Sequence, residues 1–272
     1  MKIQISKSID LNRSEQYVLI IDVHTERFSF FLYNPENQTE RFFHRYLVDK
    51  RSTALSQFKK IFFDHDFLTC PFRKILILNR TPVFTYVPNG LFEEKNKEAY
   101  MQFLFTNVEG KILHQTLLRP EITILHTLPE DFYGFLQRSF PDASIVHHTA
   151  ATIAWCQDRC PVVDGNRMII YRQPEGMDVL CFSRQQLLLS NHFRCKSMDD
   201  VIYYALFVFK QQKFSQLNDF IYLAGAETGL LELLNKYVQN VVPVERKDIM
   251  LDKFASIREA PFEIVALSEF YE

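Results

Sequence analysis

The chain has 272 residues, 47 % of them hydrophobic, and a formal net charge of −2. This composition excludes a disordered chain, and the near-neutral charge gives no general attraction to nucleic acid or anionic membranes. No run of about 18 apolar residues is present and the N-terminus lacks the apolar core of a signal peptide, so we expect a cytoplasmic protein without a transmembrane segment.

Three short strands are expected first, at residues 17–23, 27–33 and 41–48, because apolar runs there are separated by short turns. A helix with apolar residues at helical spacing follows, and Ser52 is its expected N-cap. The uninterrupted apolar run 73–79 is typical of a strand buried on both faces. The first 80 residues therefore run β-β-β-α-β.

The middle of the chain is less regular, since residues 80–120 carry several prolines and the turn pair Asn89-Gly90. The elements expected around and after this segment are a helix near 93–105, a strand at 121–127, a helix from about Pro129, and a short strand that leads into an Ala-rich helix over 143–159. This segment is predicted to be an insertion into the first unit.

The order then restarts after a linker at 160–166. The expected elements are strands at 167–173, 177–183 and 187–195, a helix at 197–212 capped by Ser197 with Asp200, a strand at 219–225, a further helix, a strand at 241–244, and a closing helix or strand. Two units of the same β-β-β-α-β order predict an α/β fold with mixed sheets covered by helices. We expect one unit over residues 1–160, with the insertion near 80–120, and the other over 161–272.

Three stretches carry a family resemblance. The first hairpin contains Asp22, Val23, His24 and Thr25, the segment 147–155 reads HHTAATIAW, and the strand that ends at Gly225 reads IYLAGAE over 221–227. Together with the duplicated order, they resemble the actin-like ATPase superfamily, which places two ribonuclease H-like units side by side. The family's first hairpin reads Asp-x-Gly-Thr and its adenosine motif is a strand that ends in Gly-Gly. The chain is most similar in style to pilus-assembly and secretion members, and we expect a bacterial family.

The resemblance would place a site for ATP and magnesium at four residues: Asp22, Thr25, Gly225 and Glu227. Three departures from the family pattern argue against a working site, the first being that only Gly225 remains of the glycine pair. His24 stands where the first hairpin has glycine, and Tyr171 stands where the second hairpin has aspartate. Phosphate-binding loops need glycine, and the whole chain has 7. We therefore expect no cofactor and a degenerate nucleotide site.

Two functions are compatible with this pattern. The first is a non-catalytic actin-like protein, a pseudo-ATPase that acts as a binding or scaffolding module for a protein partner or for further copies of itself. The alternative is a divergent nucleotide-binding ATPase or kinase that uses Asp22 and Thr25. Nucleic-acid processing would need several clustered carboxylates to hold two metals. The strand ends offer little beyond Asp22 and Asp178, so we expect no nucleic-acid partner.

The roles of several single residues stay open at this level. Asp22 is either a turn carboxylate that accepts from a nearby N–H or a vestigial metal or phosphate position. Glu227 is either an ordinary first-turn residue of a helix or a nucleoside contact. Cys156 and Cys160 lie four apart, which is wider than the paired spacing of most zinc sites, so no metal site is expected.

An aromatic segment over residues 83–92 is the predicted partner-binding surface. Its four large side chains are Phe84, Tyr86, Leu91 and Phe92. Proline and glycine interrupt the segment, so complete burial is not expected, and exposed aromatic groups are typical of interfaces. The alternative is that the segment folds back onto the first sheet.

Overall fold

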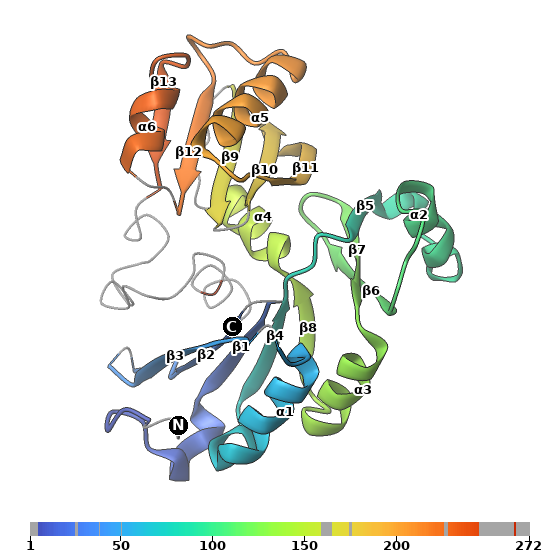
Figure 1. The fold of residues 1–272 in the computed structure, drawn as a ribbon, viewed down its shortest axis with the longest axis vertical. Coiled ribbons are helices and arrows are strands. Elements are labelled where there is room, and N and C mark those ends of the chain that lie inside the picture. Colours follow the sequence, from blue (N-terminus) through green and yellow to red (C-terminus); the bar gives the residue numbers. More distant parts are fainter. Residues whose placement is uncertain are drawn as a thin grey trace. The chain divides into compact units, whose positions relative to one another are not determined.

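The computed structural model describes residues 5–24, 27–37, 39–49, 51–158, 165–173, 176–225, 228–244 and 264 (Figure 1). The chain divides into two compact units, and the boundary falls between Thr152 and Ile153. The first unit holds the residues before this boundary together with Ile264, which is fully buried.

The first unit contains a mixed sheet, the first sheet, with the strand order β3-β2-β1-β4-β8. Its strands are β1 (Val18–Val23), β2 (Arg27–Tyr33), β3 (Arg41–Leu47), β4 (Lys74–Asn79) and β8 (Ser144–His147). The helical segments that accompany it are η1 (Leu11–Gln16), α1 (Ala54–Asp64), η2 (Asp66–Thr69) and α3 (Glu130–Ser139). Because β1, β4 and β8 run parallel, their carboxyl ends lie along the same edge of the sheet.

The core of the first unit forms where alternate residues of β1 and β2 meet α1 and α3. Phe28 and Phe30 from β2 pack on Phe58 of α1, and the rings of Phe28 and Phe58 lie 5.1 Å apart edge to face. The helix α1 is capped by Thr53, whose side chain accepts from the backbone N–H of Ser56. The expected cap at Ser52 was therefore wrong by one residue.

The predicted insertion forms a separate antiparallel sheet, the small sheet, with the strand order β5-β7-β6. Its elements are β5 (Phe84–Pro88), η3 (Asn89–Leu91), η4 (Glu94–Asn96), α2 (Lys97–Leu104), β6 (Lys111–Leu117) and β7 (Ile122–Leu128). Val87, Met101, Ile112 and Leu125 form its own core between sheet and α2. In Figure 1 this sheet lies beside β8 and α3. The strand β6 was not predicted.

The second unit contains the second sheet, with the strand order β11-β10-β9-β12-β13. Its elements are β9 (Asn166–Gln173), β10 (Gly176–Ser183), β11 (Gln186–Arg194), α5 (Met198–Gln211), β12 (Phe220–Ala224), α6 (Thr228–Leu234) and β13 (Asn240–Pro243), while α4 (His148–Asp158) spans the boundary. Ser197 and Asp200 form the predicted capping box of α5. The core of this unit lies between the sheet and the helices α5 and α6.

The two sheets share one topology. In each, the first strand pairs antiparallel with the second and parallel with the fourth, and a further parallel strand follows. The predicted repetition of the order β-β-β-α-β is confirmed. The expected linker at 160–166 and the closing element lie largely outside the described residues. Among the described residues, no helix combines the length and the hydrophobicity that a membrane span requires.

Candidate functional site

Asp22 lies at the carboxyl end of β1, opposite Ser29 of β2 and beside Leu78 of β4. Its carboxylate is fully buried. The residue that follows β4 is Arg80, whose backbone N–H donates to the carbonyl of Val23 at 3.1 Å. The Nε atom of Arg80 donates to Oδ1 of Asp22 at 2.6 Å, and the Arg80 side chain is only 3 % exposed. Asp22 is therefore one half of a buried ion pair.

This ion pair differs from the turn-cap role predicted for Asp22, whereas the vestigial metal or phosphate position stays a prediction. Its Oδ2 atom has no hydrogen-bond partner among the described residues, so Asp22 does not act as a turn cap. A buried carboxylate is costly unless a cation compensates its charge. Arg80 supplies that cation from within the chain. Local sequence patterns do not indicate this pairing, because the two residues lie far apart along the chain.

Histidines from β7, β8 and α4 gather near the carboxyl end of β4. Asn79, the last residue of β4, donates from its side chain to Nδ1 of His126 at 2.8 Å. The ring centroid of His147, the last residue of β8, lies 5.2 Å from that of His126 and 4.3 Å from that of His148. Nδ1 of His147 lies 2.7 Å from the hydroxyl of Thr149. This edge of the first sheet is therefore filled with packed, hydrogen-bonded imidazoles.

The histidine cluster is neutral at its centre. The pKa of His126 is lowered to about 3, mainly by burial and also by the nearby imidazoles of His148 and His114. Because Asn79 donates to Nδ1, the proton of the neutral ring is on Nε2. Within the described residues, no group of three or more histidine, cysteine or acidic side chains could hold a metal ion.

The second hairpin, β9–β10, matches the first in register. In the second hairpin, Gln173 and Gly176 are the last paired residues before the turn. In the first hairpin, His24 and Arg27 occupy the equivalent positions on either side of the turn. Counting back two residues from these pairs, the position of Asp22 corresponds to Tyr171, which is buried. The alignment inferred from the sequence, with a tyrosine in place of the second aspartate, agrees with the strand pairing.

The second hairpin does contain a carboxylate, but it lies on β10 and not on β9, the strand that carries Tyr171. Asp178 on β10 pairs with Tyr171 across the hairpin and is 3 % exposed. Its Oδ1 accepts from Nδ1 of His192 at 2.8 Å, and its Oδ2 accepts from the side-chain amide of Gln173 at 2.5 Å. Both oxygens are therefore engaged by neighbouring strands of the same sheet.

Gly225 follows β12 with a φ of +68°, a left-handed conformation that favours glycine. A Cβ atom here would lie 2.6 Å from the carbonyl oxygen of Arg172 and 3.1 Å from the ring of Tyr171. The glycine therefore permits close packing against β9. Thr25 and Glu227, the other two predicted site residues, lie outside the described residues.

The four residues of the predicted partner surface are placed differently from one another. Phe84 is buried, with its ring centroid 4.5 Å from that of His147. Tyr86 is half-buried and donates from its hydroxyl to Thr149 at 2.8 Å. Phe92 packs against the small-sheet core, and Leu91 is 68 % exposed. The segment thus builds the small sheet and does not present all four side chains together.

The repeated sheet topology, with a hairpin at the start of each unit, defines an actin-like ATPase fold. A Bacteroides thetaiotaomicron protein of actin-like ATPase fold and unknown function superposes with a TM-score of 0.82 at 27 % identity, over 96 % of this chain and 98 % of that one. The PilM-PilN type IV pilus biogenesis complex gives a TM-score of 0.50 at 13 % identity, over 94 % and 97 %. The resemblance inferred from the sequence is confirmed for the fold.

The chain belongs to the family described as "Protein of unknown function (DUF3822)", whose model matches residues 6–241. No match was found among curated proteins.

Proposed function

We propose that this chain is a non-catalytic actin-like protein, a pseudo-ATPase that acts as a binding or scaffolding module. The observation that carries the proposal is the buried ion pair between Asp22 and Arg80. A magnesium ion needs carboxylate oxygens and phosphate oxygens that are free to coordinate it. The carboxylate of Asp22 is fully buried and already neutralised, so it is unsuited to that role.

A cation beside Asp22 would also meet the guanidinium of Arg80. Like charges repel strongly where water is excluded, and Arg80 remains protonated at any accessible pH. In the second hairpin, Tyr171 offers no carboxylate and Asp178 is bound to His192 and Gln173. The described residues of the two hairpins therefore do not fit a magnesium nucleotide.

The partner we propose is another protein or a further copy of this chain. A chain of the same fold, PilM, is found in a complex with PilN, which supports a binding role for this fold without identifying a partner. We also propose a bacterial, cytoplasmic protein. The Bacteroides relative supports the first part. The described cysteines Cys70, Cys156, Cys181 and Cys195 are free thiols, as is usual in a reducing compartment.

A thermal-shift titration with ATP and magnesium tests the proposal. A ligand at 100 times its dissociation constant adds about 2.7 kcal/mol to the free energy of unfolding. We expect no shift for the wild type or for Asp22→Asn, each compared with its own ligand-free melting temperature. Asp131→Asn, an exposed acid on α3, is the matched control. If ATP and magnesium raise the melting temperature of the wild type and of Asp131→Asn but not that of Asp22→Asn, the ATPase or kinase alternative is restored.

A further inference from the structure

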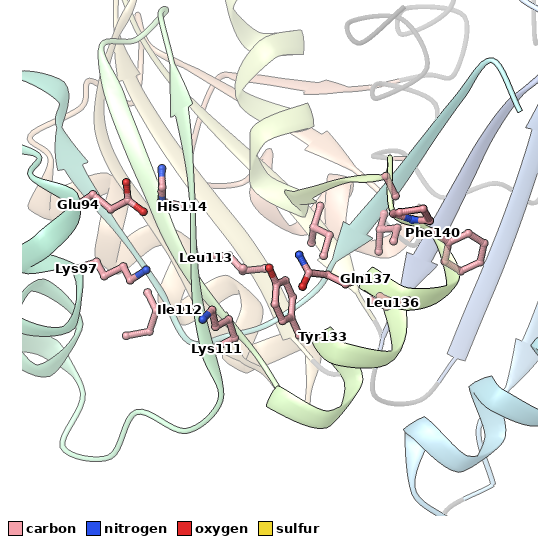
Figure 2. Close-up of a pocket in the computed structure, with 14 residues that line it drawn as sticks. Glu94, Lys97, Lys111, Ile112, Leu113, His114, Tyr133, Leu136, Gln137 and Phe140 are labelled. Atoms are coloured by element: carbon pink, nitrogen blue, oxygen red, sulfur yellow. The ribbon is translucent and has the colours of Figure 1, made fainter.

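A cavity of about 440 Å³ in the first unit lies between β6 and α3 and reaches the residues before and within β8 (Figure 2). We call it the β6 groove. Its two facing walls are formed by Lys111, Ile112, Leu113 and His114 of β6 and by Tyr133 and Gln137 of α3. Figure 2 shows the hydroxyl of Tyr133 and the side-chain amide of Gln137 in the space between strand and helix.

The groove follows the free edge of β6. Ile112 packs into the small-sheet core, whereas Leu113 packs toward the core of the first sheet, so the two side chains point to opposite faces. Both still line the groove, as do Lys111 and His114. In the described part of the chain β6 pairs only with β7, so this edge presents backbone N–H and C=O groups without a strand partner.

The edge strand β8 comes close to β6 at Gln115, just after the groove-lining residues of β6. The backbone N–H of His147 donates to the side-chain oxygen of Gln115 at 3.1 Å. The two strands are thus linked there through a side chain and not through a backbone ladder. The four residues Lys111–His114 precede this link, and they span about 13 Å of strand. This length suits a short extended segment.

The charge of the groove favours an acidic ligand. Lys97 of α2 and Lys111 both line it, and neither forms an ion pair with any residue that the structure describes. The ammonium of Lys111 lies 5.9 Å from the ring centroid of Tyr133. Glu94 is the carboxylate among the lining residues, so the lysine charges exceed it.

We propose that the β6 groove binds an extended peptide segment of a partner protein. The segment adds to β6 as a further strand and directs a carboxylate toward Lys97 and Lys111. Its backbone satisfies the free edge, and its alternate apolar side chains contact Leu113 and Tyr133, which line the groove and are partly exposed. A concave site walled by a helix admits a single chain more readily than the sheet edge of a second folded copy. This inference rests on the proposed binding role and adds the place and chemistry of the partner.

Selection of phage-displayed random peptides on the purified protein tests the inference. We expect enriched peptides with alternating apolar residues and at least one Asp or Glu. The double variant Lys97→Ala/Lys111→Ala is expected to bind them about tenfold more weakly. Lys95→Ala is the matched control, because the ammonium of Lys95 pairs with Glu93 and does not line the groove. Hydrogen exchange at the amides of 111–114 should slow when peptide is bound.

A blocked groove provides the second test. Gln137→Trp places an indole in the groove from an exposed position of α3, and Arg138→Trp places the same group at the next exposed position, outside the lining. We expect binding to be lost only in the first variant. The inference is overturned if no peptide is enriched, or if both variants bind equally. It is also overturned if the groove instead holds a second copy, seen as a dimer in sedimentation that only Gln137→Trp dissociates. None of these outcomes depends on nucleotide, so the pseudo-ATPase proposal stands or fails separately.

Discussion

At the scale of residues, the pair Asp22–Arg80 is maintained because a single buried charge without its partner would strongly destabilise the fold. Both side chains are almost fully buried, so each would be an uncompensated charge without the other. Replacing a buried pair by neutral groups is far less costly than removing one partner, because the desolvation penalty disappears with the charges.

We therefore expect Arg80→Met to lower the free energy of unfolding by about 3–5 kcal/mol. The double variant Asp22→Asn/Arg80→Met should be clearly more stable than Arg80→Met alone, since no charge is left buried. Urea denaturation of the two single variants and the double variant measures the coupling. Additive effects of the two substitutions would show that the ion pair does not determine the stability of this strand end.

The buried histidine cluster predicts a loss of stability in mild acid. The pKa of His126 is lowered to about 3 in the folded state, whereas the ordinary value of 6.5 applies to the unfolded chain. As the pH falls below 6.5, the unfolded state binds a proton that the folded state does not. The contribution of His126 to stability is thus complete above pH 6.5 and declines below it, by about 2 kcal/mol at pH 5.

Denaturation of the wild type and of His126→Gln at pH 7 and pH 5 checks this expectation. Glutamine does not titrate and can still accept from Asn79. We expect the variant to lose about 2 kcal/mol less than the wild type between the two pH values. An equal loss in both proteins would assign the acid sensitivity to other groups.

Sequence reasoning identified Asp22 but not its partner. An arginine directly after an apolar strand was visible at position 80, yet only the parallel register of β1 and β4 brings it to Asp22. The cluster around His126 was missed for the same reason, since its members come from β7, β8 and α4. Contacts between strand ends depend on strand order, which local patterns do not encode.

At the scale of elements, most strands could be predicted because apolar residues alternate or run without interruption between turns. The strand β6 was missed because Ile112 and Leu113 are adjacent apolar residues followed by polar ones, so no clear alternation is present. Each faces a different core, which is possible only because the small sheet has packing partners on both faces. The glycine at position 110, which adopts a φ of +88° in the turn before β6, was the sequence feature that could have indicated the start of this strand.

Gly176 shows how tightly the second hairpin packs against β11. A Cβ atom at this position would lie 2.2 Å from the carbonyl oxygen of Phe193 and 3.0 Å from Nε2 of His192. We expect Gly176→Ala to destabilise the protein by about 1–3 kcal/mol, because a strand must shift.

The matched control is Gly229→Ala, since a Cβ atom on that helical residue meets nothing within 4 Å. Alanine in a helix is favoured over glycine by about 0.5–1 kcal/mol, so this variant should be neutral or more stable. Thermal melts of the two variants measure the contrast. Equal effects would mean that crowding at Gly176 is relieved without cost.

At the scale of the whole molecule, each unit has its own sheet and its own apolar core. The repetition could be predicted because both halves carry the same order of strands and helices. The division of contacts at Thr152–Ile153 could not be seen in the sequence, since α4 is continuous across it and the turn signals come only after residue 160. Helix propensity reports local structure and not which core a helix serves.

The single tryptophan permits a test of how independently the units unfold. Trp155 is buried in the second unit, near Tyr222. Phe58→Ala removes a core ring from the first unit and should cost about 3–5 kcal/mol there. We expect the circular dichroism transition to begin at a lower urea concentration, while the urea midpoint of the Trp155 fluorescence transition changes little.

The reciprocal variant is Phe209→Ala in the core of the second unit, which should shift the fluorescence transition directly. If Phe58→Ala moves both signals equally, the chain unfolds as one cooperative body, and the two cores are coupled.

The guanidinium of Arg80 is a counter-ion tied to the backbone. A diffusible ion leaves when its concentration drops, but Arg80 stays 2.6 Å from Asp22 whatever the surrounding solution contains. The folded state at this strand end is therefore independent of the supply of divalent cations. A chelator such as EDTA should leave the stability of the protein unchanged. The first hairpin should keep one charge state when the cellular magnesium concentration changes.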